Sequence, residues 1–301
     1  MELKKVLKKR KKVIQILVSN DDGILAPGIQ ALGRALKAVG HVTMVAPERE
    51  QSTMGHALTL HKPVRLKKIY SEKGMDQWAT SGTPADCVYL GIRQVLKSRP
   101  DIIVSGINNG VNVGNDIYYS GTVAAAREGA VLNIPAIATS LDFHLEPGEK
   151  PQANFEDCAA YVVGLVRQVL EHGLPMHCML NVNFPNLPFS KIKGACVSRQ
   201  GFRNYTDRVI EKHDNRGKPY FWLGGTYAGF RSIEGSDCEV LDKGYISVSP
   251  CRLDITQYEF LSSITGWDLW PVQKKRGAKS KRAAKPKRAA KSKTAKKAKK
   301  K

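Results

Sequence analysis

The order of apolar segments at the start of the chain limits the fold more than any other feature. Residues 13–19 (VIQILVS) form a short β-branched run that predicts a buried strand. Residues 27–39 carry apolar side chains at helical spacing, Gly40 is the expected C-cap, and residues 41–46 (HVTMVA) predict a second strand. This spacing predicts a βαβ unit, with a parallel strand pair and a right-handed crossover.

The alternation of strands and helices continues to residue 184. Helices are predicted at 83–96, 122–132 and 155–170, and strands at 101–105, 135–140 and 179–184. We therefore expect an α/β fold with a doubly wound, mostly parallel sheet. Beyond residue 191 two further strands are predicted, at 192–198 and 245–249. The Gly-, Asn- and aromatic-rich segment between them predicts a β-rich subdomain or arm, a candidate for contacts between subunits.

The net charge of +21 belongs to the two ends of the chain. Residues 274–301 hold 16 Lys and Arg and no acid, and residues 1–12 hold seven against one Glu. Residues 13–273 are nearly neutral, with 25 basic and 26 acidic side chains. The tail lacks aromatic and large aliphatic residues, so we expect it to be disordered, and 1–12 to be a basic N-terminal extension.

The cysteines and the N-terminus predict a cytoplasmic protein. The six cysteines are widely spaced without a CxxC pair, which favours reduced thiols over disulfides or a zinc site. The apolar run after the basic N-terminus is only six residues long and is interrupted by Gln15. It is too short for a signal peptide or a membrane span, so no membrane association is expected.

Two adjacent acids follow the first predicted strand, in Ser19-Asn20-Asp21-Asp22-Gly23. In open α/β sheets ligands bind outside the carboxyl ends of the strands. Ionised carboxylates held close together repel each other unless a cation neutralises them, and oxygen ligands favour Mg²⁺, Mn²⁺ or Ca²⁺. The alternative is an Asx-rich turn that caps the next helix.

A second polar segment follows the predicted strand at 101–105. It begins Ser105-Gly106-Ile107-Asn108-Asn109-Gly110 and continues through Asn112. An Asn carbonyl is a neutral ligand that can complete a carboxylate site, and Gly and Asn allow close approach of the backbone to an anion. The alternative is a long surface loop, although long loops are usually functional or disordered.

Two further segments carry polar groups suited to a phosphate. Ser120-Gly121-Thr122 opens a predicted helix, where hydroxyls, free N–H groups and the helix dipole form an anion site; the alternative is an N-cap by Ser120 alone. After the second strand, Ser52 is a candidate metal ligand and His56 a candidate proton donor or phosphate contact, although a single loop His is usually a surface group.

Together these segments resemble the SurE family of stationary-phase survival proteins. The matching segments are ILVSNDDGILAPGIQAL, APEREQSTMGHALTL, SGTPADCVYL, SGINNGVNVGNDIYYSGTVAAAREGA and LDKGYISVSP, in the family's order over residues 13–256. The resemblance implies a metal-dependent 5′-nucleotidase, with 3′-nucleotidase and short-chain exopolyphosphatase side activities. It also implies a Rossmann-like core with a swapped C-terminal element, and a homodimer or homotetramer.

The resemblance also implies which residues form the site. The metal ligands would be Asp21, Asp22, Ser52 and Asn108, and the phosphate would be held by Asn112, Ser120, Gly121 and Thr122. The basic ends are not part of the family pattern, and residues 203–235 match it only loosely. We expect a SurE-like domain at 13–256, a C-terminal segment at 257–273 and the basic tail at 274–301.

The hypothesis from the sequence is hydrolysis of nucleoside monophosphates with one divalent cation, Mg²⁺ or Mn²⁺. Water would attack in line; a covalent aspartyl phosphate on Asp21 is the alternative. A competing hypothesis is a nucleic-acid-associated protein in which the tail has the main role, because a Lys-rich segment binds phosphate backbones without sequence preference. Such a tail would also contact polyphosphate weakly.

Overall fold

The computed structural model describes residues 13–143, 154–267 and 269. Two compact units divide at Ile255 and Thr256. The described part of the second unit contains one helix, α6 (Tyr258–Ile264). The expected extension at 1–12 and the tail at 274–301 lie outside the described residues. Among the residues that are described, no helix is both long enough and apolar enough to cross a bilayer.

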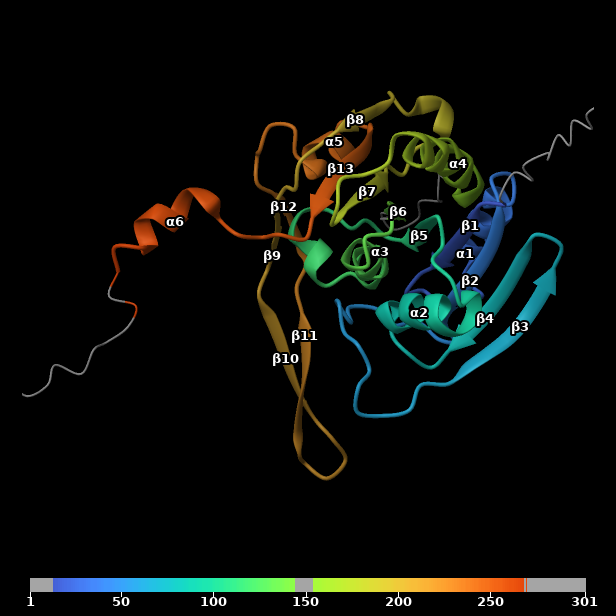
Figure 1. Ribbon diagram of the computed structural model, residues 1–301. Helices are drawn as coiled ribbons and strands as arrows, with labels where there is room; N and C mark the ends of the chain where they lie inside the picture. Colours follow the sequence, from blue (N-terminus) through green and yellow to red (C-terminus); the bar gives the residue numbers. More distant parts are fainter. Residues whose placement is uncertain (1–12, 144–153, 268, 270–301) are drawn as a thin grey trace, which may run out of the picture. The chain divides into compact units, whose positions relative to one another are not determined.

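The first unit is built on a nine-stranded sheet (Figure 1). Its order is β3 (Leu66–Glu72), β4 (Met75–Thr80), β2 (His41–Pro47), β1 (Gln15–Ser19), β5 (Ile102–Asn109), β6 (Ala136–Leu141), β7 (Cys178–Phe184), β13 (Ile246–Arg252) and β8 (Ala195–Val197). The six strands from β4 to β7 are parallel. β3 and β13 pair antiparallel with β4 and β7, and β8 pairs parallel with β13. The predicted α/β fold with a mostly parallel sheet is confirmed.

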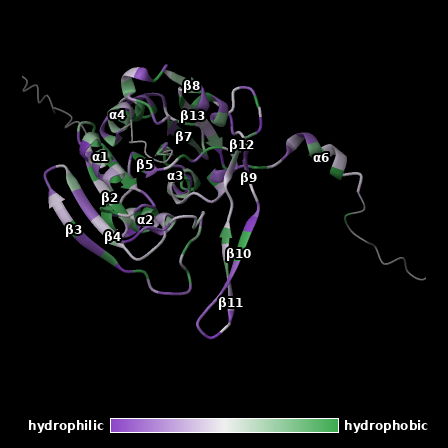
Figure 2. Ribbon diagram, turned by 180° about the vertical axis from the view of Figure 1, so that it is seen from behind, coloured by the Kyte–Doolittle hydropathy of each residue, from purple (hydrophilic) through white to green (hydrophobic). Residues whose placement is uncertain are grey.

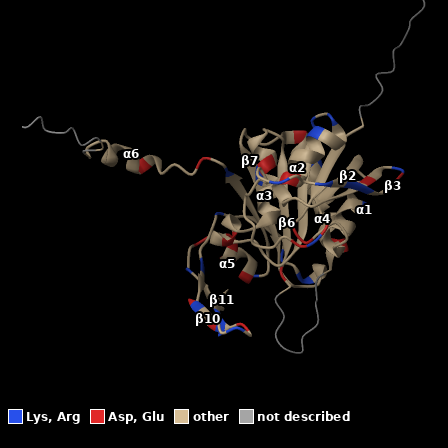
Figure 3. Ribbon diagram, turned by 90° about the horizontal axis from the view of Figure 1, so that it is seen from below, with Lys and Arg blue, Asp and Glu red and all other residues tan. Residues whose placement is uncertain are grey.

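Helices cover both faces of the sheet. α1 (Pro27–Leu36) and α4 (Phe155–His172) pack in one core cluster, and α2 (Pro84–Leu90) and α3 (Gly121–Val131) pack in the other. The hydrophobic residues gather along the sheet and on the helix faces against it (Figure 2). Charged residues of both signs are interspersed over the described chain, in keeping with its near-neutral body (Figure 3).

The ends of α1 and β5 differ from the prediction. α1 ends at Leu36 with Lys37 as C-cap, so the predicted cap at Gly40 is wrong. A Cβ at Gly40 would lie 2.3 Å from the Ile14 carbonyl oxygen, so this glycine allows close approach to the segment before β1. β5 extends to Asn109, four residues beyond its predicted end, because its pairing with β6 resumes at Asn108 after an irregularity.

Several elements were not predicted. These are the β3–β4 hairpin, the short helix α5 (Asp237–Asp242) and the 3₁₀ turns η2 (Gly114–Tyr118) and η3 (Phe189–Lys191). The helix predicted at 83–96 is present as α2 followed by the π-helical turn η1 (Gly91–Leu96). The segment expected to be β-rich contains two antiparallel pairs, β9 (Arg203–Tyr205) with β12 (Tyr227–Phe230) and β10 (Arg208–His213) with β11 (Pro219–Gly224). β10 and β11 extend away from the sheet as an arm whose root is the β9–β12 pair (Figure 1).

The strand order reverses between β1 and β5. From β1 the chain proceeds to β2 and β4 on one side, and then crosses to β5, β6 and β7 on the other. Helices on opposite faces diverge at such a switch point, which leaves a crevice at the carboxyl ends of the two strands. Asp21 and Asp22 follow β1 and Asn108 lies near the end of β5, so the fold brings these polar segments to the crevice.

Candidate functional site

Asn20 shapes the turn that carries the two aspartates. Its Nδ2 donates to the Gly23 carbonyl oxygen at 3.0 Å, and the Gly23 amide donates to its Oδ1 at 3.2 Å. Gly23 has a φ of +104°, which favours glycine. Helix α1 begins after Ala26 without a side-chain cap. The predicted Asx turn therefore exists, but Asn20 forms it, and neither aspartate caps the helix.

Asp21 is buried and held by the start of helix α3. The Gly121 amide donates to its Oδ2 at 3.1 Å, and the Thr122 hydroxyl donates to its Oδ1. Burial raises the pKa of Asp21, although the hydrogen bonds from Thr122 and Gly121 oppose this effect. The carboxylate is thus fixed in position, and its charge lacks the solvation that water would give it.

Asp22 lies next to Asp21 and is less tightly held. The Asn109 amide donates to its Oδ2 at 3.2 Å. Burial, the negative charge of Asp21 and, to a smaller extent, that of Glu50 raise the pKa of Asp22 to about 6. Two carboxylates in this arrangement favour a proton or a metal cation between them.

Asn108 and Ser52 provide neutral oxygens at the same cavity. The Asn108 carboxamide is oriented by a bond from Nδ2 to the Gly110 carbonyl oxygen at 2.7 Å, and its Oδ1 lies 3.3 Å from the Thr122 hydroxyl that also contacts Asp21. The Ser52 hydroxyl donates to a Glu50 carboxylate oxygen. The structure therefore places all four predicted metal ligands around one cavity.

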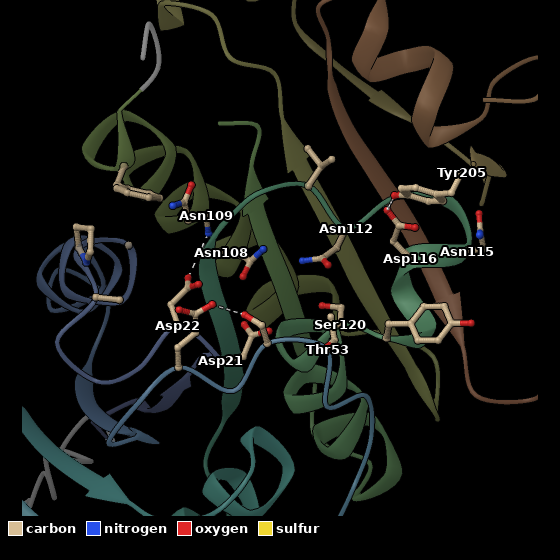
Figure 4. A pocket seen from close by; sticks show the side chains of 18 residues that line it. Asp21, Asp22, Thr53, Asn108, Asn109, Asn112, Asn115, Asp116, Ser120 and Tyr205 are labelled. Carbon is tan, nitrogen blue, oxygen red and sulfur yellow. Dashed lines mark hydrogen bonds between the residues drawn. The ribbon is translucent and has the colours of Figure 1, made fainter. Parts of the chain in front are cut away.

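This cavity has a volume of about 860 Å³ and lies over the switch point. Figure 4 shows Asp21 and Asp22 on one side, Asn108 and Asn112 in the middle, and Asn115, Asp116 and Tyr205 on the other side. Among the described residues, its lining contains four carboxylates and no Lys, Arg or His. The acids are Asp21, Asp22, Glu50 and Asp116. Such a cavity repels a phosphate dianion unless a cation is present.

The four predicted phosphate-binding residues separate into two pairs. Asn112 and Ser120 line the cavity, whereas Gly121 and Thr122 do not line it and bind Asp21 instead. The Ser120 hydroxyl oxygen accepts from the Val123 amide at 3.0 Å, so Ser120 is also the N-cap that the sequence allowed. Gly121 and Thr122 thus position a carboxylate, and of the four residues Asn112 and Ser120 line the cavity.

Asn112 is held by a buried polar network that the sequence analysis missed. Its amide donates to Asn183 Oδ1 at 2.8 Å, and its carbonyl accepts from Asn181 Nδ2 at 2.8 Å and from Asn183 Nδ2 at 3.1 Å. Its own Nδ2 donates to the Ser140 hydroxyl at 2.8 Å. The signal was present, because Asn181 and Asn183 are polar residues two apart in the otherwise apolar strand β7.

His56 is not among the residues that line the cavity. Its Nε2 lies 2.8 Å from Glu128 Oε2, and Glu128 is buried on α3. The expected role of His56 as proton donor or phosphate contact therefore has no support from its position. The histidine satisfies a buried carboxylate at the side of α3.

The root of the arm contributes groups that were not predicted. The Tyr205 hydroxyl donates to Asp116 Oδ2 at 2.6 Å, and Arg203 Nη1 donates to the same oxygen at 2.7 Å. The Arg203 amide donates to Asn115 Oδ1 at 2.7 Å. These contacts join residues nearly ninety positions apart, and spacing along the chain gives no signal for them.

The thiols agree with the prediction. All six cysteines are free, and burial raises the pKa of four of them, Cys87, Cys158, Cys238 and Cys251. In the described part of the chain, no three or more His, Cys, Asp and Glu side chains are grouped so that they could hold a metal ion. A cation at the cavity would therefore need the neutral oxygens beside its two adjacent carboxylates.

Comparison with known proteins identifies relatives of this chain. The sequence profile of the family described as Survival protein SurE matches residues 16–207. The 5′-nucleotidase SurE of Geobacter sulfurreducens is 47% identical over 267 residues, which are 89% of this chain and 98% of that protein. The 5′-nucleotidase SurE 1 of Thermus thermophilus is 48% identical over 255 residues, 84% and 97% of the respective chains. The crystal structure of the SurE protein from Aquifex aeolicus superimposes with a TM-score of 0.70 at 44% identity and covers 83% of this chain and 98% of that one.

Proposed function

This chain belongs to the SurE family, and from this premise we propose that it is a metal-dependent 5′-nucleotidase that hydrolyses nucleoside 5′-monophosphates to nucleoside and phosphate. We further propose that the reaction needs one divalent cation, Mg²⁺ or Mn²⁺, with Asp21, Asp22, Asn108 and Ser52 as ligands. The 5′-nucleotidase activity follows from relatives that cover most of this chain.

The charge of the cavity lining is the main support for the proposed metal dependence. The described lining of the cavity contains four carboxylates and no basic side chain, although a phosphate monoester is a dianion at neutral pH. A bound cation would supply the positive charge that this described lining lacks. The donor set fits a hard cation, because two carboxylates, a carboxamide and a hydroxyl supply only oxygen ligands.

The cation and the residues that line the cavity would have different roles in the reaction. A bound divalent cation would supply positive charge that polarises the phosphoryl group and lowers the pKa of water. Asn112 and Ser120 orient the phosphate by hydrogen bonding. Because Asn112 is held by the buried β7 asparagines, its position changes little when the substrate binds. The start of α3 contributes by holding Asp21, because Gly121 and Thr122 donate to its carboxylate.

The contacts of Asp21 favour attack by water over a covalent aspartyl phosphate. One carboxylate oxygen of Asp21 accepts from Thr122 and the other from Gly121. A nucleophilic carboxylate would have to give up one of these bonds in a buried site, which opposes its attack on phosphorus. We propose that water attacks in line and that the nucleoside leaves as the alcohol after protonation.

Removal of the cation tests this function. We expect purified protein to release phosphate from nucleoside 5′-monophosphates in Mg²⁺ or Mn²⁺, and to lose this activity in excess EDTA because the carboxylates then repel the substrate. Activity should return on addition of the metal. The affinity for the cation, measured by titration with Mn²⁺, should also fall as the pH drops through about 6, because a proton on Asp22 competes with the cation. Undiminished turnover in rigorously metal-free buffer would refute the proposal.

The finer properties implied by the family are part of the same proposal. We propose 3′-nucleotidase and short-chain exopolyphosphatase side activities, and a homodimer or homotetramer with the swapped C-terminal element. The exposed apolar residues of β10 and β11 support subunit contacts, since Phe221, Trp222 and Leu223 are 55%, 60% and 85% exposed. The free cysteines support a cytoplasmic location.

The composition of the tail favours a second, additional function. Residues 274–301 hold 16 Lys and Arg and no acid. We propose that this segment retains the enzyme on nucleic acid or polyphosphate, without sequence preference. A chain that ends at residue 273 should keep its nucleotidase activity but should no longer be retained on a DNA column at low salt. Equal retention of the full and shortened chains would contradict this role, and loss of catalysis on shortening would contradict the independence of the two functions.

A further inference from the structure

The two ends of the cavity differ in chemistry. One end carries Asp21 and Asp22, and the opposite end carries Asn115, Asp116 and Tyr205 (Figure 4). Tyr119 also lines the cavity, directly before Ser120 at the start of α3. An elongated phosphate ester that places its phosphate at the paired carboxylates must extend the rest of the molecule along the cavity. What lies at the far end therefore selects the alcohol part of the substrate.

Tyr205 is held rigidly at this far end. Its hydroxyl donates to Asp116 Oδ2 at 2.6 Å, and Arg203 Nη1 donates to the same oxygen at 2.7 Å. The Arg203 guanidinium carbon lies 5.4 Å from the centroid of the Tyr205 ring. The Tyr205 ring also packs edge-on against Tyr227, with 6.1 Å between the ring centroids. The side chain is still 43% exposed, so part of the fixed ring faces the cavity. A fixed ring binds a flat ligand with little loss of conformational entropy.

Tyr119 and Asn115 add an apolar surface and a hydrogen-bond donor. Tyr119 is 64% exposed although it lines a cavity. Asn115 Oδ1 accepts from the Arg203 amide at 2.7 Å, which sets the orientation of the carboxamide. Among the described residues, no hydrogen-bond partner is found for its Nδ2, so this group is available to a ligand in the cavity.

Phe155, the third aromatic residue of the lining, is already packed. Its ring centroid lies 5.1 Å from that of Phe143. A Cβ at Gly28 would lie 3.2 Å from its ring, so α1 packs closely against it as well. Phe155 is part of the rim of the core between α1 and α4. The tyrosines at the other end therefore offer the aromatic faces that a ligand can cover.

We propose that the base of the nucleotide stacks on Tyr119 and Tyr205, with the Asn115 amide group donating to the base. This subsite deepens the proposed nucleotidase function and rests on it. Stacking tolerates every base, because each has a π face. The subsite therefore selects nucleotides over phosphate esters without a base, and discriminates only weakly among the bases.

The matched substrates are adenosine 5′-monophosphate and ribose 5-phosphate, which share the sugar and the phosphate and differ by the base. In Tyr119→Leu and Tyr205→Leu, kcat/KM for adenosine 5′-monophosphate should fall about tenfold, as expected for loss of one stacking contact. For ribose 5-phosphate it should change less than twofold. Tyr205→Phe keeps the ring and should retain most of the preference for the nucleotide.

Tyr118→Leu is the matched control, because Tyr118 is the adjacent tyrosine, is 49% exposed and does not line the cavity. It should behave as the wild type with both substrates. If kcat/KM of the Tyr119 and Tyr205 variants fell equally for both substrates, the tyrosines would have a structural role, and the proposed subsite would be overturned. Unchanged kcat/KM for the nucleotide would overturn it too.

Calorimetric titration with adenosine separates the subsite from catalysis, because it requires neither phosphate nor turnover. Adenosine should bind the wild type and bind Tyr119→Leu about tenfold more weakly. Equal binding by both proteins, or no binding by the wild type, would overturn the subsite even if the enzyme hydrolyses nucleotides. Conversely, absence of hydrolysis with tyrosine-dependent adenosine binding would count against the proposed reaction only.

Discussion

Asp22→Asn should lower kcat/KM for nucleoside monophosphates by several orders of magnitude while making the metal-free protein more stable. The neutral carboxamide keeps the shape of the side chain and can accept from the Asn109 amide, which now donates to Asp22 at 3.2 Å. It removes one of two charges that we propose bind the cation, so activity should fall steeply. Steady-state kinetics at saturating Mg²⁺ or Mn²⁺ measures this loss.

The gain in stability follows from the raised pKa of Asp22. Because folding raises this pKa from 3.8 to about 6, the folded state binds the proton more tightly than the unfolded state does. The stability that this group contributes is present below pH 3.8 and is lost as the pH rises through about 6. At pH 8 the variant should therefore exceed the metal-free wild type by about 3 kcal/mol in free energy of unfolding, because each unit of pKa shift corresponds to about 1.4 kcal/mol.

Denaturant titrations in EDTA at pH 4.5 and pH 8 measure this difference, which should grow with pH. Asp76→Asn is the control. Burial raises the pKa of Asp76, but the ion pair with Lys68 at 2.8 Å and the bonds with Ser71 and His41 together lower it below its usual value. That substitution should reduce stability at pH 8 and leave turnover unchanged. A variant of Asp22 with normal turnover, or one less stable than the wild type at pH 8, would show that the carboxylate pair has another role.

Gly121→Ala should reduce activity at least about a hundredfold by displacing Asp21. A Cβ at this position would lie 2.6 Å from Asp21 Cβ and 2.8 Å from its Oδ2, so the carboxylate or the start of α3 must move. Misplacement of a catalytic group by about 1 Å can cost roughly a hundredfold in rate. The fold should survive, because alanine is favoured over glycine in a helix by about 0.5–1 kcal/mol.

Gly164→Ala is the matched control for this substitution. Gly164 lies in helix α4, and a Cβ there would meet nothing within 4 Å. Its replacement should raise the free energy of unfolding by about 0.5–1 kcal/mol and leave kcat/KM unchanged. Metal titrations of both variants complete the test, because only Gly121→Ala should bind Mn²⁺ more weakly. Wild-type metal affinity in Gly121→Ala would show that Asp21 is not constrained as the contacts indicate.

The sequence predicted the core of the fold because its signals are local. Each signal lies within about a dozen residues, as in the apolar run at 13–19, the helical pattern from Pro27 and the buried run at β5. The alternation of strands and helices then predicts parallel pairing, which the sheet shows. The grouping of Asp21, Asp22 and Asn108 was predictable as well. Carboxyl ends of neighbouring parallel strands meet at one edge of a sheet, so residues 87 positions apart come together.

The tertiary structure alone decided what each polar group binds. Thr122 and Gly121 have the composition of an anion site, but α3 packs so that they donate to Asp21. His56 has the chemistry of a proton donor, but it lies against the buried Glu128. Asn181, Asn183 and Tyr205 reach the site from strands far along the chain. The sequence shows which groups can form hydrogen bonds. Which partners lie within hydrogen-bond distance depends on the packing of segments that are distant in the sequence, and this packing is a property of the whole fold.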